Sequence, residues 1–327
     1  MTATTLVTGG AGYIGSHTVR ALRRQGRRAV VIDTLERGNA EHVLDAELVI
    51  GDIADEPLVE ELCKRHDVDS VIHFAAYKRV GESMENPSIY FHNNVDATAR
   101  LLDAVRRAGV ERVVFSSSCS VYGTPVKVPI DESESIKPES VYADTKAIVE
   151  RMLQWYHQVH GVRSVSLRYF NAAGASDDAS IGEDWSNAAN LIPLVMRATL
   201  RGGERLQVFG DDYPTADGTC VRDYVHVDDL ADAHIAALDY LAHGGATTAI
   251  NVGTGVGSSV FEVIRGVERV TGQPVPYDVV PRRPGDPVES YADASLAKTL
   301  LGWSARHDLD SILETAYRWH KRQLAKA

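Results

Sequence analysis

The sequence has few of the residues that define several protein classes. It contains only three cysteines, Cys63, Cys119 and Cys220, and their spacing fits neither a metal site nor a disulfide framework. Its twelve histidines form no paired ligand motif, so we expect no metal site. No apolar run reaches the about 18 residues of a membrane span, and no basic and apolar leader precedes the first predicted strand. These absences predict a cytoplasmic protein without export signal or membrane anchor.

The sequence also lacks an excess of basic residues. Its 327 residues include 34 Lys and Arg against 45 Asp and Glu, which gives a formal net charge of −11. We therefore do not expect nucleic acid or an anionic membrane surface as the main partner. The apolar content of 44% is ordinary for a globular protein, and the length allows one large or two coupled domains with an ample core.

A glycine-dense turn stands almost at the N-terminus, between a predicted strand at 4–8 and a predicted helix at 14–25. Read from Gly10, the turn is G-x-G-x-x-G. Such glycines let the backbone approach a pyrophosphate, which the N-terminus of the following helix favours. A second predicted strand, 29–32, ends in Asp33, where a carboxylate would hold a ribose 2′-hydroxyl and repel a 2′-phosphate. The combined signature predicts NAD rather than NADP.

Strand and helix patterns alternate through the first half of the chain. Because apolar strands that alternate with amphipathic helices indicate a parallel sheet covered on both faces, we predict an α/β fold with a doubly wound Rossmann sheet. Ligands bind beyond the carboxyl ends of such strands. The further predicted strands are 47–50, 70–76, 112–116 and 164–169, and the helices are 56–65, 87–108 and 141–160.

Past Gly174 this alternation stops, and a polar, turn-rich stretch covers 177–189. We predict an NAD-binding domain at 1–175 and a smaller mixed α/β lobe for the substrate at 176–327, with some of its segments returning to the large sheet. The predicted helices of this half are 192–201, 228–241, 260–271 and 309–324, and the strands are 206–209 and 249–251.

A second group of residues suggests acid–base chemistry. Tyr142 and Lys146 are four residues apart on a predicted helix, so their side chains share one face. A free tyrosine is a poor base at neutral pH, but a nearby ammonium and the positive nicotinamide of NAD would favour its phenolate. Ser118, at a strand end, could bond the same substrate hydroxyl. A surface Tyr–Lys pair is the alternative for an isolated Y-x-x-x-K, and the dinucleotide signature favours the catalytic interpretation.

Several motifs together resemble the extended short-chain dehydrogenase/reductase family, namely T-G-G-x-G-Y-I-G-S-H, H-F-A-A, S-S-S-x-x-V-Y-G, Y-x-x-x-K and R-Y-F-N. The later motifs F-G-D-D-Y-P-T, D-G-T-C-V-R-D-Y-V-H-V and P-R-R-P-G-D resemble members that epimerise UDP-hexoses at C4. The resemblance implies an isomerase that keeps NAD bound and interconverts UDP-glucose and UDP-galactose through a 4-keto intermediate. It also implies a homodimer packed through the helices near 87–108 and 141–160.

The resemblance assigns roles residue by residue. The catalytic residues are Tyr142, Lys146 and Ser118. The implied NAD contacts are Gly9, Gly12, Tyr13, Ile14, Gly15, Asp33, Asp52, Ile53, Phe74, Ala75, Lys78, Asn93, Ser116, Tyr142, Lys146, Tyr169 and Phe170. The implied UDP-hexose contacts are Ser118, Tyr142, Asn171, Asn190, Leu191, Gln207, Phe209, Arg222, Arg283, Asp286 and Ser290.

Ser290 is a departure with a consequence for specificity. It stands where epimerases restricted to glucose and galactose carry a bulky tyrosine, and where relatives that accept N-acetylated sugars carry a small residue. We therefore hypothesise that UDP-GlcNAc and UDP-GalNAc are also substrates.

Three other functions are compatible with the same fold. A nucleotide-sugar dehydratase would need an acidic pair after Ser118, where this chain has Cys119 and Ser120. An NAD-dependent dehydrogenase that releases NADH is possible on the residues alone. A non-catalytic NAD(H)-sensing protein is disfavoured because Tyr142 and Lys146 are intact.

Overall fold

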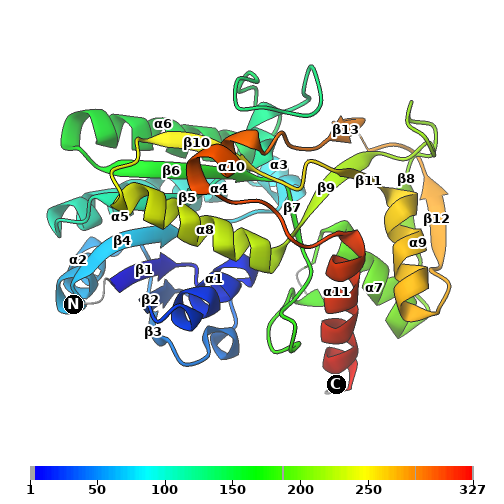
Figure 1. Cartoon of the computed structure of the whole chain (residues 1–327), viewed down its shortest axis with the longest axis horizontal. Helices are drawn as coiled ribbons and strands as arrows, with labels where there is room; N and C mark the ends of the chain where they lie inside the picture. The colour runs from blue at the N-terminus through cyan, green and yellow to red at the C-terminus, as the bar shows by residue number, and fades with distance from the viewer. Residues whose placement is uncertain (1–3, 186–187, 284, 326–327) are drawn as a thin grey trace.

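Seven parallel strands form the central sheet of the computed structural model, which describes residues 4–185, 188–283 and 285–325 (Figure 1). The doubly wound α/β class predicted from the sequence is confirmed. The strand order is β10 (Thr248–Val252), β6 (Arg163–Tyr169), β5 (Arg112–Ser116), β4 (Val68–His73), β1 (Thr4–Thr8), β2 (Arg28–Asp33) and β3 (Glu47–Ile50).

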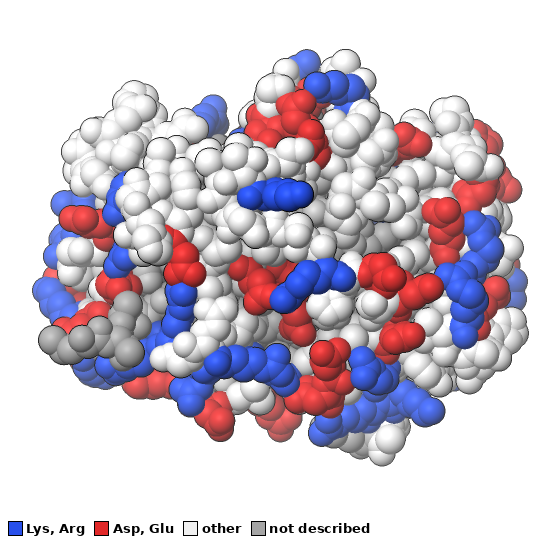
Figure 2. All heavy atoms as spheres, in the orientation of Figure 1, with Lys and Arg blue, Asp and Glu red and all other residues white. Residues whose placement is uncertain are grey.

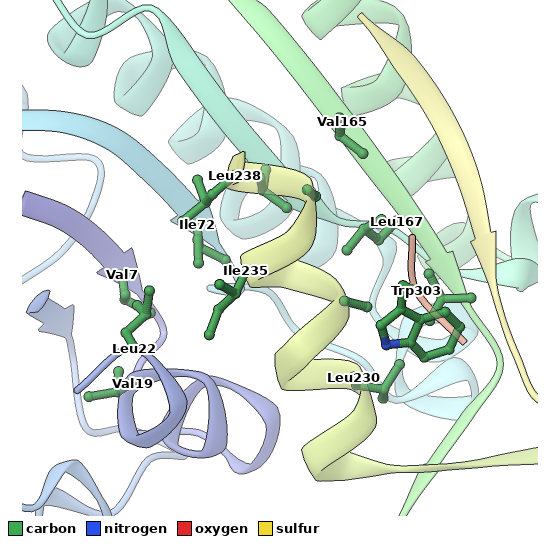
Figure 3. Close-up of a cluster of buried hydrophobic side chains, with 14 of the residues drawn as sticks. Val7, Val19, Leu22, Ile72, Val165, Leu167, Leu230, Ile235, Leu238 and Trp303 are labelled. Carbon is green, nitrogen blue, oxygen red and sulfur yellow. The ribbon is translucent and has the colours of Figure 1, made fainter. Parts of the chain in front are cut away.

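The central strands are apolar because both faces of the sheet are covered. Successive residues point to opposite faces, so Leu6 and Val7 of β1 belong to two different core clusters. Val7 packs toward α1 (Tyr13–Arg24) and α8 (Val227–Ala242), and Figure 3 shows α8 lying between Leu22 of α1 and Trp303. Leu6 packs toward the cluster built with α2 (Glu56–Arg65), α5 (Ala97–Arg107) and α6 (Val141–His160).

The predicted helix at 87–108 is interrupted in the structure. It consists of α4 (Pro87–Tyr90), a π-helical segment η2 (Phe91–Asp96) and α5, and a helix that we did not predict, α3 (Val80–Glu85), precedes it. Asn94, within η2, is buried and bonds the backbone of Tyr77 and the hydroxyl of Thr145. The π segment therefore turns an amide toward the loop after β4 and toward α6.

The second half of the chain builds a smaller lobe, seen on the right of Figure 1. Its helices are α7 (Leu191–Arg201), α9 (Val260–Thr271) and α11 (Leu309–Leu324). A four-stranded sheet contains β7 (Asn171–Ala173), β9 (Val221–His226), β11 (Gly257–Ser259) and β13 (Glu289–Ser290), and a two-stranded sheet pairs β8 (Leu206–Phe209) with β12 (Tyr277–Val280). The remaining short helices are η1 (Ala40–Val43), η3 (Cys119–Tyr122) and α10 (Ser295–Leu301).

Three elements from the second half lie against the large sheet, namely β10, α8 and α10. Strand β10 pairs in parallel with β6 at its edge, and α8 packs on α1. The predicted domain boundary near residue 175 remains a prediction. Segments after this residue return to the large sheet, so one cut in the sequence does not separate the two parts.

Acidic and basic side chains are interspersed over the face of the molecule drawn in Figure 2. Among the described residues, no helix combines the length and the apolar character needed to cross a membrane.

A buried ion pair fastens α6 to the sheet. Arg168 of β6 donates to both carboxylate oxygens of Glu150 on α6, with Nε–Oε1 at 3.0 Å and Nη2–Oε2 at 2.5 Å. The hydroxyl of Ser117 donates to the same carboxylate at 2.5 Å, and Arg168 also donates to the Tyr122 hydroxyl at 2.9 Å. Both charged side chains are less than a tenth exposed. Water therefore stabilises neither charge, and each is compensated mainly by the opposite charge of the other.

We expect Glu150→Gln to lower the free energy of unfolding by about 3 kcal/mol, because the guanidinium of Arg168 would stay buried without its counter-charge. Urea titration of the purified variant measures this. Glu61→Gln is the matched control, since Glu61 pairs with Arg65 on the exposed surface of α2 and should lose less than about 1 kcal/mol. Equal losses for the two variants would contradict the assignment.

Candidate active site

A cavity of about 320 Å³ opens at the carboxyl edge of the large sheet. Its walls come from the glycine turn after β1, from the segments that follow β2, β3 and β4, from the last residues of β5 and β6, and from α6. Every residue that the sequence assigned to the cofactor lines it except Phe170. The side chain of Phe170 is instead buried in a separate cluster with Val121 and Ile130.

The glycine turn is closely packed and leaves its helix end uncapped. A Cβ on Gly15 would lie 2.3 Å from the carbonyl oxygen of Gly9, and one on Gly9 would lie 2.6 Å from the nitrogen of Ala75. Gly12 is the N-cap of α1 without a side-chain cap, and the first turn has no acidic residue. The free N–H groups of this helix end therefore suit an anion such as a pyrophosphate.

Asp33 joins the turn to the end of β2. Its Oδ2 accepts from the backbone nitrogen of Ala11 at 3.0 Å, and its Oδ1 accepts from that of Leu35 at 2.9 Å. The carboxylate also lines the cavity. A negative charge held there favours ribose hydroxyls and opposes a 2′-phosphate, so the geometry fits NAD.

The structure adds cavity residues that the sequence analysis did not assign. Arg37 and Tyr77 follow the ends of β2 and β4, so their positions after strands were the available signal. Glu183 comes from the polar stretch 177–189, where no motif marked it. Its Oε1 accepts from Lys78 Nζ at 3.1 Å and from Asn190 Nδ2 at 3.2 Å. Lys78 and Asn190, predicted for different ligands, thus share one carboxylate.

The three predicted catalytic residues come together at this cavity's end. Helix α6 begins at Val141, where Ser140 caps it by accepting from the nitrogen of Ala143, and this sets Tyr142 and Lys146 on the inner face. Lys146 Nζ donates to the Ser116 carbonyl at 2.8 Å and lies 5.9 Å from the centre of the Tyr142 ring. Ser118 caps η3 by accepting from the nitrogen of Ser120, and its polar side chain near the Tyr142 phenol lowers the pKa of that phenol.

Burial controls the protonation of this pair. It raises the pKa of Tyr142 well above its usual value, more than the nearby Ser118 side chain lowers it. It lowers the pKa of Lys146 to about 7. In the chain alone, desolvation disfavours the charged form of both groups, so the expected phenolate remains a prediction that depends on the positive charge of bound NAD as well as on Lys146. The ammonium also donates to a carbonyl rather than to the phenol.

Five of the predicted UDP contacts gather on the smaller lobe, outside the cavity described above. The guanidinium of Arg283 lies 4.2 Å from the centre of the Phe209 ring. Asp286 lies 3.7 Å from both Arg222 and Arg283, and Ser290 of β13 pairs with Arg222 of β9. An aromatic face and two guanidiniums thus stand close together.

The remaining predicted UDP contacts are more dispersed. Asn171 donates through Nδ2 to the carbonyl of Asp223 at 3.0 Å, which ties β7 to β9. Gln207 is exposed on β8, and Leu191 begins α7 beside the core of the lobe. Within the described residues, no group of three or more His, Cys, Asp and Glu could hold a metal ion.

Comparison with known proteins agrees with this geometry. Residues 5–253 match the model of the NAD dependent epimerase/dehydratase family. A UDP-glucose 4-epimerase of Halalkalibacterium halodurans is 46% identical over 97% of this chain and 95% of its own length. The crystal structure of a UDP-glucose 4-epimerase from Stenotrophomonas maltophila, with bound NAD and formylated UDP-arabinopyranose, superposes with a TM-score of 0.97 at 42% identity, covering 99% of this chain and 100% of that chain.

A third similar protein has a broader name. The UDP-Glc/GlcNAc 4-epimerase of Campylobacter jejuni superposes with a TM-score of 0.86 at 36% identity, covering 98% of this chain and 99% of that chain. The match to the family model and these full-length likenesses lead to one conclusion. The chain belongs to the NAD dependent epimerase/dehydratase family, and its cofactor is NAD.

Proposed function

We propose that this chain interconverts UDP-glucose and UDP-galactose by inverting C4 of the hexose, with NAD kept bound through the cycle. The observation that carries the proposal is the convergence of Tyr142, Lys146 and Ser118 at a cavity whose wall is the uncapped N-terminus of α1. Relatives named UDP-glucose 4-epimerase, similar over nearly their whole length, support the same reaction.

The residues around the cavity would hold NAD in a fixed orientation. The glycine turn and the start of α1 suit its pyrophosphate, and Asp33 suits a ribose hydroxyl. Lys146, Ser116 and Tyr169 also line the cavity, and the hydroxyls of Ser116 and Tyr169 bond each other at 2.7 Å. When bound, NAD supplies a hydride acceptor that later serves as the donor.

Tyr142 is the proposed acid–base group. As the phenolate, which the positive charge of bound NAD would favour, Tyr142 would take the proton of the 4-hydroxyl while the C4 hydrogen leaves as hydride to the cofactor. It would return the proton after the sugar has turned over and the hydride has come back to C4. Ser118 acts on the pKa of the phenol and would bond the same substrate hydroxyl, which would orient it toward Tyr142. Lys146 lies beside the ring and contributes positive charge when protonated.

The smaller lobe would hold UDP while the sugar turns. Arg222 and Arg283 offer forked donors that suit a diphosphate, and Phe209 would offer uracil the ring face that the Arg283 guanidinium does not cover. Both guanidiniums stand 3.7 Å from Asp286, beyond hydrogen-bond distance. That carboxylate therefore does not use their donors fully, although Nη1 of Arg222 donates to the carbonyls of Val221 and Pro287.

The proposal extends to assembly and location. Exposed apolar side chains on the helices implied for a homodimer support such a contact, since isolated surfaces of this kind are usually covered. We propose a cytoplasmic homodimer, supported by free cysteines throughout the chain. The exposed residues are Ile89, Phe91, Trp155 and Val159.

Tyr142→Phe should lower kcat for UDP-galactose by at least about a hundredfold, because it removes the proton acceptor while leaving the ring in place. Proton NMR of the sugar anomeric signals, without added NAD, measures the conversion. The wild-type protein should reach a constant ratio of UDP-glucose to UDP-galactose.

Tyr156→Phe, on the same helix, is the control, because its hydroxyl bonds Asp103 away from the cavity. It should retain wild-type activity. Unchanged turnover in Tyr142→Phe would refute the catalytic assignment, and stoichiometric appearance of NADH in the wild type would indicate a dehydrogenase.

The free energy of unfolding of cofactor-stripped protein should rise between pH 7 and pH 10 through Lys146. The folded pKa of Lys146 is about 7 and its ordinary value is 10.5, so the unfolded chain binds more protons in this window. The slope from one such group is at most about 1.4 kcal/mol per pH unit. Urea titrations at several pH values should show that Lys146→Met removes this rise, and parallel curves for variant and wild type would contradict the lowered pKa.

We further propose that N-acetylated UDP-hexoses are substrates. Ser290 lies in β13 beside Arg222, and a serine there leaves room for a 2-acetamido group that a tyrosine would fill. The broader name of the similar Campylobacter jejuni epimerase shows that both activities occur within this fold.

Ser290→Tyr should lower UDP-GlcNAc turnover at least about tenfold while UDP-galactose turnover stays within about threefold, since discrimination by bulk in one pocket is worth about 1–3 kcal/mol. NMR assays with each substrate measure both rates. Ser290→Ala is the matched control and should retain both. Absence of UDP-GlcNAc turnover in an active wild type would overturn this specificity proposal alone.

A further inference from the structure

Two loops meet across the glycine turn. In the sheet order β4-β1-β2, strand β1 lies between the other two, so the loops after β2 and β4 flank the turn that follows β1. Both loops touch the turn. The nitrogen of Asn39 donates to the Ala11 carbonyl at 3.0 Å, and Ala75 stands where a Cβ on Gly9 would collide with it.

Farther along, the same two loops touch each other. The guanidinium carbon of Arg37, after β2, lies 4.0 Å from the centre of the Tyr77 ring, after β4. The Tyr77 hydroxyl donates to Glu36 at 2.7 Å. The two loops and the turn therefore form a closed ring of contacts, and both Arg37 and Tyr77 line the cavity.

Glu82 of α3 fastens this contact. Nη1 and Nη2 of Arg37 donate to its two carboxylate oxygens, each at 2.9 Å. The Tyr90 hydroxyl donates to the same carboxylate at 2.7 Å. The pair is only partly shielded, since a third of the Arg37 side chain and a quarter of the Glu82 side chain are exposed. A fork-to-fork ion pair stacked on an aromatic ring is specific in geometry, yet salt can weaken it.

We propose that Arg37, Tyr77 and Glu82 form a clasp that retains the bound dinucleotide. A dinucleotide with its pyrophosphate at the start of α1 lies inside the ring that the two loops close. It leaves only after Arg37 has separated from Tyr77 and Glu82. This inference goes beyond the proposed reaction and depends on it only in that NAD occupies this cavity.

The same geometry argues against a role for Arg37 in binding a 2′-phosphate. An arginine in this loop is the residue type that accommodates NADP. Here both terminal nitrogens of Arg37 are used by Glu82, and Asp33 and Glu36 add negative charge nearby. Retention of the cofactor therefore explains the arrangement better than recognition of a phosphate.

Exchange of resident NAD for isotopically labelled NAD, followed by mass spectrometry of the intact holoenzyme, tests the clasp. Glu82→Gln and Arg37→Met should each speed exchange about tenfold. The double variant should be little faster than either single one, because both remove the same interaction. Raising the salt concentration should speed exchange in the wild type and have a much smaller effect in the variants.

Two comparisons separate the clasp from general destabilisation. Glu61→Gln and Arg65→Met break an exposed Arg–Glu pair on α2, far from the cavity, and should exchange NAD at the wild-type rate. Tyr77→Phe keeps the stacked ring and should exchange slowly, whereas Tyr77→Leu should exchange rapidly.

Wild-type exchange rates in Glu82→Gln and Arg37→Met would overturn the clasp. Faster NAD exchange in these variants would also overturn the clasp if raising the salt concentration still accelerated it as much as in the wild type. The acceleration would then not come from loss of the ion pair. Neither result bears on the proposed epimerisation. That proposal is refuted by a different result, namely unchanged turnover of UDP-galactose in Tyr142→Phe.

Discussion

The carboxylate of Glu150 is the group on which the geometry of the active site depends. It pairs with Arg168 and accepts from Ser117, so it holds α6 against β6 and against the serine-rich end of β5. Lys146 is one helical turn earlier on the same face, and the negative charge of Glu150 opposes the desolvation of its ammonium. A single buried carboxylate therefore sets the helix, the strand end and part of the electrostatics of the lysine.

Burial of Tyr142 and Lys146 shifts the pKa values of both side chains. Desolvation raises the pKa of Tyr142 and lowers that of Lys146, so the chain alone favours the neutral forms of both. A site of this kind becomes a proton acceptor only when its occupants supply positive charge and exclude water. Proton transfer is thereby linked to a filled cavity, which suits an enzyme that must protect a reactive keto sugar from solvent.

The large sheet could be predicted from the sequence because its physical signal is local. Strands covered on both faces must be apolar throughout, and the predicted bounds at 112–116 and 141–160 agree with β5 and α6. The π-helical segment was missed because its cause is tertiary, the bonds of Asn94 to Tyr77 and Thr145. Strands of two or three residues, such as β11 and β13, are too short for periodicity to reveal.

The cofactor side of the site could likewise be anticipated wherever a motif or a strand end marks a residue. Contacts between distant residues could not, because nothing in the sequence near Arg37 indicates Tyr77 or Glu82, and nothing near Lys78 indicates Glu183.

These unpredicted contacts show a difference between the two ligand sites. Around the cavity, closely packed glycines and paired side chains leave little freedom. On the smaller lobe, Arg222 and Arg283 stay beyond hydrogen-bond distance of Asp286. Inversion at C4 requires the cofactor and the diphosphate of the substrate to stay in place while the sugar turns. A closely packed cofactor site suits the first requirement, and arginines with donors left for a diphosphate suit the second.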